Sequence, residues 1–151
     1  MALQYVREQT EEMCLEAVRQ NGLALHFVKD QTEKICIEAV RQDGLAIQFV
    51  ENQTDEICIE ALKQDKLAIR YIKEKDKYLD EFNIKYLEKQ GKVREVIAIK
   101  ENGKWLFSIG CQNNITKEEF IYRIYNTNGG FDPEKGINLH RQIYLKFLEK
   151  F

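Results

Sequence analysis

A phrase repeated three times at an offset of 22 residues constrains the fold of this chain more than any other feature. The phrase Thr10–Leu25 returns at Thr32–Ile47 and again at Thr54–Ile69, with no insertion between the copies. Self-similarity at a fixed period is typical of proteins built from stacked structural repeats. We therefore expect each copy to form one small unit that packs against the next copy.

Each copy has the features of two short helices. A threonine opens every copy (Thr10, Thr32 and Thr54), and its oxygen can accept the free amides of a first helical turn. Gly22 and Gly44 suit the left-handed residue that follows a helix end. Lys66 replaces this glycine in the third copy, so we expect the third turn to differ or to be strained.

The second helix of each copy is expected at 23–28, 45–50 and 67–72. It is apolar at almost every position, which predicts burial on more than one side. Neither helix of a copy reaches the ~12–15 residues that an isolated helix needs in water. The neighbouring copies must therefore supply the burial that makes these helices stable.

The chain begins with the second half of a repeat, because Ala2–Thr10 matches Ala24–Thr32. Leu3, Tyr5 and Val6 would then be poorly covered on one side. We expect this segment to be an unorthodox cap, a surface for self-association through residues 2–9, or part of a longer array.

A different pattern follows the repeats. Residues 76–91 are charged and carry apolar residues at helical spacing, which predicts a linking helix that caps the array. Asn102-Gly103 then separates two β-rich runs, Val93–Ile99 and Trp105–Ile109, and Asn-Gly at such a place indicates a β-hairpin. A lone hairpin is marginally stable in water, so it should pack on helices.

Two helices are expected after the hairpin. Thr116 and Glu119 form the pattern of a capping box at the start of the first helix, which should stop at residues 128–130. A loop is expected at 131–136, and the last helix from about Leu139. The prediction is a mainly α fold: a short α-hairpin repeat solenoid over 1–75, a linking helix over 76–91, and a small α+β unit with one β-hairpin and two helices over 92–151.

The repeated phrase also carries a family resemblance. In the first two copies it reads Cys-Leu/Ile-Glu-Ala-Val-Arg-Gln-Asn/Asp-Gly-Leu-Ala-Leu/Ile-x-Phe-Val. This phrase resembles the tandem-repeat domains of unknown function found in large-virus, phage and bacterial proteins, and is distantly similar to leucine-rich-variant repeats. The resemblance covers residues 2 to about 72. It implies stacked short helices, and it carries over no catalytic residue.

The strongest binding candidate is a set of charged residues at two positions of the repeat, which we call the charge ladder. Stacking should align these side chains in rows, and repeat proteins bind partners through such faces. The alternative is a solvated surface on which each glutamate pairs with the cation three residues later in its own helix. The ladder consists of Glu16, Glu38, Glu60, Arg19, Arg41 and Lys63.

Other chemistry-bearing residues are weaker candidates. His26 and His140 have no partner at a metal-ligand spacing, and no Cys-x-x-Cys pair exists, so we expect no metal site. Cys111 follows a predicted strand, and an enzyme with a site near Cys111 and His140 is one alternative. The other cysteines share one repeat position and are expected in the core, as small apolar residues: Cys14, Cys36 and Cys58.

The net charge of −2, with both signs mixed along the chain, argues against a dedicated nucleic-acid binder. No apolar run approaches the ~20 residues of a membrane span, and no signal peptide is evident, so a cytoplasmic protein is expected. Without an acid–base, metal or nucleotide motif, we predict a non-catalytic protein-protein interaction module that needs no cofactor. A narrower alternative, motivated by the phage resemblance, is a phage or mobile-element inhibitor that docks on a host defence enzyme, in the manner of an anti-CRISPR protein.

Overall fold

The computed structural model describes residues 3–126, 131–132 and 137–151. The chain forms two compact units, residues 1–78 and 79–151, and each is considered by itself. The helix end predicted at 128–130 and residues 133–136 of the predicted loop lie outside the described residues.

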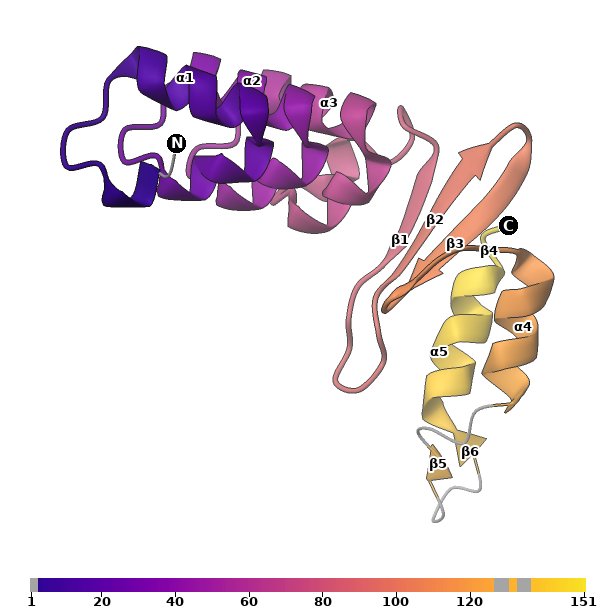
Figure 1. The fold of residues 1–151 in the computed structure, drawn as a ribbon. Helices are drawn as coiled ribbons and strands as arrows, with labels where there is room; N and C mark the ends of the chain where they lie inside the picture. The colour runs from indigo at the N-terminus through magenta and orange to yellow at the C-terminus, as the bar shows by residue number, and fades with distance from the viewer. Residues whose placement is uncertain (1–2, 127–130, 133–136) are drawn as a thin grey trace. The chain divides into compact units, whose positions relative to one another are not determined.

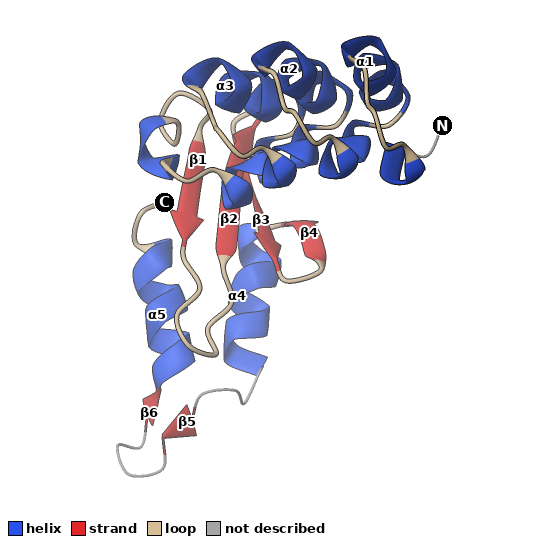
Figure 2. Ribbon diagram, turned by 90° about the vertical axis from the view of Figure 1, so that its left-hand side faces the viewer, coloured by secondary structure: helices blue, strands red, loops and turns tan. Residues whose placement is uncertain are grey.

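The first unit is a stack of helix pairs arranged in two layers (Figures 1 and 2). One layer holds the α-helices α1 (Glu11–Gln20), α2 (Glu33–Gln42) and α3 (Asp55–Gln64). The other holds 3-10 helices: η1 (Leu3–Tyr5), η2 (Gly22–Phe27), η3 (Gly44–Phe49) and η4 (Lys66–Tyr71). The second helix of each repeat is thus present, but it is a 3-10 helix.

Side-chain caps set the boundaries of these helices. The hydroxyl oxygens of Thr10, Thr32 and Thr54 accept from the amides three residues later, at 3.2, 3.3 and 3.4 Å, which confirms the predicted N-caps. A second cap starts each 3-10 helix, where a side-chain oxygen accepts from the amide two residues later. These second caps are Asn21, Asp43 and Asp65, which lie in extended conformation between the two helices of a pair.

The repeated cysteines lie in the core, as predicted. Cys14, Cys36 and Cys58 are each only 3% exposed. Burial, with a smaller effect from Glu51 and Glu33, raises the pKa of the Cys36 thiol to about 11, so this thiol stays protonated near neutral pH. The 3-10 helices are less completely buried than expected, because Phe27 and Tyr71 are exposed at their ends.

The explanation expected for the repeat glycines was wrong. Gly22 and Gly44 do not have positive φ. They are needed because the next repeat packs closely: a Cβ on Gly22 would lie 2.4 Å from the carbonyl oxygen of Ala39, and one on Gly44 would lie 2.6 Å from that of Ala61. Lys66 begins η4 without a different turn, since the described stack has no fourth pair to approach it.

Glutamine side chains fix the turns after η2, η3 and η4. The Gln31 amide donates to the Phe49 carbonyl at 2.8 Å, and its oxygen accepts from the Glu51 amide at 3.1 Å. Gln9 and Gln53 make the same pair of bonds one repeat earlier and one repeat later. We call these three residues the glutamine clamps.

The first segment is better covered than the sequence predicted. Leu3 is only 2% exposed, whereas Tyr5 in the same short helix is 81% exposed. The Gln9 amide also reaches the Leu3 carbonyl, at 3.3 Å. Residues 3–5 therefore pack as part of the stack, with one aromatic side chain left at the surface.

The second unit is an antiparallel sheet covered by two helices. The sheet has the order β1 (Ile84–Leu87), β2 (Val96–Glu101), β3 (Lys104–Ile109) and β4 (Gln112–Ile115). The helices α4 (Lys117–Asn126) and α5 (Leu139–Leu148) follow, with a short pair β5 (Phe131–Asp132) and β6 (Ile137–Asn138) between them. Phe107 of the sheet packs with Phe120 of α4 and Phe147 of α5 in the core.

The hairpin prediction is confirmed, but the sheet is larger than one hairpin. Asn102 and Gly103 have φ values of 49° and 77°, and they join β2 to β3. At α4, the Glu119 amide donates to the Thr116 hydroxyl at 3.1 Å, as in a capping box. The Glu119 carboxylate does not complete that box, because it accepts from Arg123 at 2.8 Å instead.

The predicted linking helix at 76–91 was wrong. A short 3-10 turn, η5 (Lys75–Lys77), is followed by turns and then by β1. Asn83 has a φ of 54°, which ends the turns, and Ile84 then pairs with Ile99 of β2. The boundary between the two units falls after Tyr78, inside the segment that was expected to be a helix.

Candidate functional site

The stack places the members of the charge ladder in contact across repeats. Arg19 of α1 donates to Glu38 of α2 at 2.8 Å, and Arg41 of α2 donates to Glu60 of α3 at 2.7 Å. Pairing within one helix also occurs, between Lys63 and Glu60 at 2.9 Å and between Arg41 and Glu38 at 4.0 Å. Five of the six ladder residues, all except Glu16, therefore form a connected row of ion pairs, in which the cross-repeat pairs are the shortest contacts of both arginines.

These pairs change the acidity of the carboxylates. The hydrogen bond from Arg19 holds the pKa of Glu38 below its ordinary value. The hydrogen bond from Arg41, and then that from Lys63, does the same for Glu60. Glu16 has no cross-repeat arginine among the described residues and accepts from Gln20 of its own helix at 2.7 Å.

The lowered pKa values predict a pH-dependent contribution to stability. A carboxylate with a lowered pKa in the folded state stabilises the fold above its unfolded pKa, and this contribution is lost as the pH falls through the folded pKa. Glu38→Gln should therefore unfold at lower urea than the wild type near neutral pH, while the two proteins should converge in acid. Urea titrations across the acidic range measure this difference.

Glu8→Gln is the matched control for that experiment, because Glu8 is exposed and makes no ion pair in the described part of the chain. It should track the wild type at every pH. A difference between Glu38→Gln and wild type that persists unchanged in acid would contradict the ion-pair origin of the effect.

The sequence interpretation missed a second row of side chains, which we call the aromatic column. Its members occupy one position in the successive 3-10 helices. Three of them are exposed: Tyr5 by 81%, Phe27 by 40% and Tyr71 by 37%. The ring of His26 lies 4.7 Å from the ring of Phe49 in the next repeat, so the surface continues across repeats. The column consists of Tyr5, Phe27, Phe49 and Tyr71. The recurrence of an aromatic residue at this position in every copy could have indicated the column. The sequence pattern instead assigned these residues to the buried face of the second helix.

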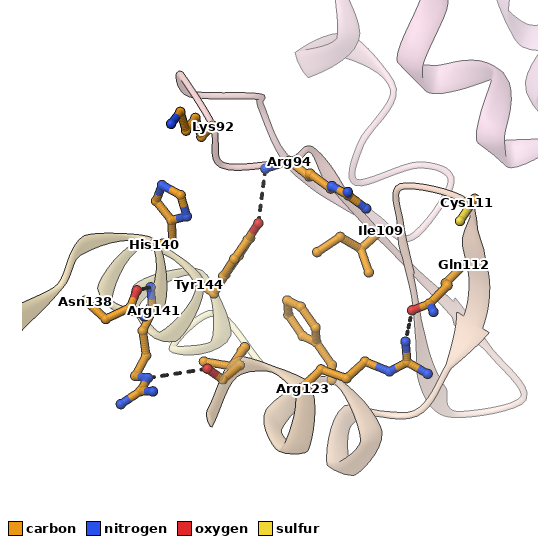
Figure 3. Close-up of a pocket in the computed structure, with 12 residues that line it drawn as sticks. Lys92, Arg94, Ile109, Cys111, Gln112, Arg123, Asn138, His140, Arg141 and Tyr144 are labelled. Carbon is orange, nitrogen blue, oxygen red and sulfur yellow. Dashed lines mark hydrogen bonds between the residues drawn. The ribbon is translucent and has the colours of Figure 1, made fainter. Parts of the chain in front are cut away.

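Cys111 and His140 line one pocket in the second unit, with a volume of about 440 Å³. Figure 3 shows them at opposite sides of it, with Tyr144 and Arg94 between them. No hydrogen bond joins the two side chains. The contact between a nucleophile and its base that the enzyme alternative needs is therefore not formed.

Two further properties of the described residues bear on function. None of their helices is both long enough and apolar enough to cross a membrane. Within the same residues, no group of three or more histidine, cysteine, aspartate or glutamate side chains is placed to hold a metal ion.

Part of the chain matches a known family. Residues 10–53 and residues 32–77 each match the family model described as a domain of unknown function, DUF4116. Both matches lie within the helix-pair stack, and the second unit lies outside them. No curated protein and no solved structure matches the chain.

Proposed function

We propose that the helix-pair stack is a non-catalytic protein-binding module and that the aromatic column is its contact surface. The observation that carries this proposal is the exposure of Tyr5, Phe27 and Tyr71 at one repeat position. Aromatic residues are enriched at protein interfaces relative to the rest of the surface. Large exposed apolar groups gathered in one place mark interaction sites more often than isolated ones do.

The backbone beneath the column is fixed before a partner binds. Each glutamine clamp donates to the carbonyl of a column residue: Gln9 to Phe27, Gln31 to Phe49 and Gln53 to Tyr71, at 2.8 to 2.9 Å. A surface that is already ordered loses less conformational entropy on binding than a flexible one. The clamps therefore support a solenoid-like face on which aromatic side chains are presented at regular spacing.

The charge ladder is the second surface in this proposal. Its two arginines already donate to glutamates of the next repeat, so a partner that used them would have to replace those ion pairs. The ladder's charges are mutually compensated, which makes it the weaker of the two candidate surfaces. A contribution to orientation of the partner is compatible with this arrangement, since charges at an interface rim affect association rate more than affinity.

An affinity capture with three baits tests the proposal. The baits are the wild type, the double variant Phe27→Ser/Tyr71→Ser, and the charge swap Glu38→Arg/Arg41→Glu. We expect a protein retained by the wild type to be lost from the aromatic variant, with a fall in recovery of about tenfold or more, because central aromatic contacts carry much of the binding energy. The charge swap should retain it.

The variants must remain folded, which equal melting temperatures would show. Retention of every wild-type partner by the aromatic variant would contradict the column as the contact surface. Loss from the charge swap alone would assign binding to the ladder instead.

A second copy of this chain is one outcome of the same proposal, through Tyr5 and the segment 2–9. Sedimentation velocity over a wide range of concentrations distinguishes this from binding of another protein. A sedimentation coefficient that stays at the monomer value at every concentration excludes self-association through the column. A concentration-dependent increase that Tyr5→Ser abolishes assigns it to self-association.

A further inference from the structure

The pocket of the second unit has an unusually one-sided set of charges. The cations that line it come from three separate segments: Lys92 and Arg94 precede β2, Arg123 lies on α4, and Arg141 lies on α5. No carboxylate among the described residues lines the pocket. Such a cavity attracts anions, because its positive charges are not compensated within the lining.

Two of these cations have no acidic partner in the described part of the chain. Neither the Lys92 ammonium nor the Arg94 guanidinium belongs to an ion pair or a side-chain hydrogen bond there. Arg123, by contrast, is paired with Glu119 at 2.7 Å, and Arg141 donates to the carbonyls of Ile124 and Tyr125 at 3.3 Å. The two side chains lie on opposite sides of the pocket, Arg94 on the side of Cys111 and Lys92 on the side of His140 (Figure 3).

The position of Arg94 is defined by its surroundings. Its backbone amide donates to the Tyr144 hydroxyl at 3.0 Å, which ties the segment before β2 to α5. Its guanidinium lies against Gly110, where an added Cβ would be 2.7 Å from the Arg94 Nη1. Figure 3 shows the Arg94 side chain above Ile109, with Lys92 and His140 across the pocket from Cys111.

The remaining walls of the pocket are apolar. They are provided by Ile109 of the sheet, Phe120 and Ile124 of α4, and the ring of Tyr144 on α5. A volume of about 440 Å³ lies within the range of small-molecule sites, which combine apolar walls with a few polar groups that orient the ligand. The arrangement fits a ligand with an anionic head and an apolar body.

We propose that this pocket binds a small organic phosphate, with the phosphate at Arg94 and the apolar body against Ile109 and Tyr144. A phosphate monoester carries more negative charge than a carboxylate, which suits a lining that holds four cations and no carboxylate among the described residues. Arginine also bonds phosphate oxygens through several donors at once. This site belongs to the second unit and is separate from the proposed protein-binding surface.

Titration of the full chain with four small probes tests the site. The probes are phenyl phosphate, inorganic phosphate, benzoate and phenol, followed by calorimetry and by amide chemical shifts. Phenyl phosphate should bind most tightly, inorganic phosphate and benzoate more weakly, and phenol not measurably. Added salt should weaken the binding of phenyl phosphate, because ionic contacts in an open pocket are screened.

Arg94→Gln should weaken the binding of phenyl phosphate by about tenfold or more, as expected for the loss of a charged hydrogen bond. Lys104→Gln is the matched control: Lys104 is an exposed cation of the same unit that does not line the pocket, and its loss should change the dissociation constant by less than about twofold. Arg94 is exposed, so both variants should keep the wild-type melting temperature.

Three results would overturn the proposal. One is the absence of saturable shifts around the pocket with phenyl phosphate. Another is equal binding by the wild type and Arg94→Gln. The third is benzoate binding as tightly as phenyl phosphate, which would assign the site to carboxylates.

Discussion

Gly44→Ala is expected to lower the free energy of unfolding by about 2 to 3 kcal/mol, since overpacking a tight contact typically costs this much. The added Cβ would lie 2.6 Å from the Ala61 carbonyl oxygen and 2.8 Å from the Gln64 amide oxygen. The first of these atoms is backbone and cannot move away without shifting α3. The substitution would also disturb the bond at 2.7 Å from the Gly44 amide to Gln64.

Lys66→Ala provides the control at the equivalent position of the last repeat. No further helix pair of the described stack packs on Lys66, so this change should alter stability by less than about 0.5 kcal/mol. Urea unfolding followed by circular dichroism measures both variants. Equal stability of Gly44→Ala and Lys66→Ala would show that close approach between repeats is not the reason for the glycine.

Gln31→Ala is expected to cost about 2 kcal/mol, because two backbone groups lose their partners at once. The Phe49 carbonyl and the Glu51 amide both bond to the Gln31 side chain, and the chain reverses direction between η3 and α3 at this place. The first of these bonds is partly buried, so water replaces it incompletely. The loss should also reduce binding through the aromatic column, since Phe49 belongs to it.

Gln20→Ala is the matched control for the clamp. Gln20 is a glutamine of the same unit, and its amide bonds to the exposed Glu16 carboxylate at 2.7 Å and to no other side chain in the described part of the chain. Its removal should cost less than about 0.5 kcal/mol. Thermal unfolding of the two variants in parallel makes the comparison. A cost at Gln20 as large as that at Gln31 would mean that the clamp bonds add nothing specific.

Local signals in the sequence predicted the helix starts and the hairpin well. Thr10, Thr32 and Thr54 cap their helices through atoms only three residues away, so their role depends little on the rest of the fold. The same holds for Asn102 and Gly103, whose positive φ values are a property of the turn itself. The role of Gly22 was not accessible in this way, because the atom that requires it belongs to Ala39 of another repeat.

The strands at the two edges of the sheet show the limits of pattern reading. In β1, Tyr86 and Leu87 fall at helical spacing after Phe82, and pairing with β2 decides their conformation. β4 is mostly polar, and it joins the sheet through an irregular pairing with β3 near Asn114, which has a φ of 59°. Neither feature has a period that distinguishes it from a loop or a helix.

The candidate sites were harder to predict than the fold. The charge ladder was visible from spacing, but its pairing across repeats depends on how closely α1, α2 and α3 pack. The enzyme alternative named Cys111 and His140, which line the pocket, but the cations of the pocket were not predicted. Arg94 and Arg141 come to line one cavity only when the helices fold back over the sheet. Single cations far apart in a sequence carry no signal of a shared cavity.

Hydrogen exchange of the wild type and Gly44→Ala, followed by mass spectrometry, tests most directly the claim that neighbouring helix pairs hold one another in place. We expect faster exchange throughout α2, η3 and α3 in the variant, extending to η4, because each pair depends on contacts with the next. The second unit should keep its wild-type exchange. Faster exchange confined to the few residues around position 44, with α3 and η4 as protected as before, would contradict the account.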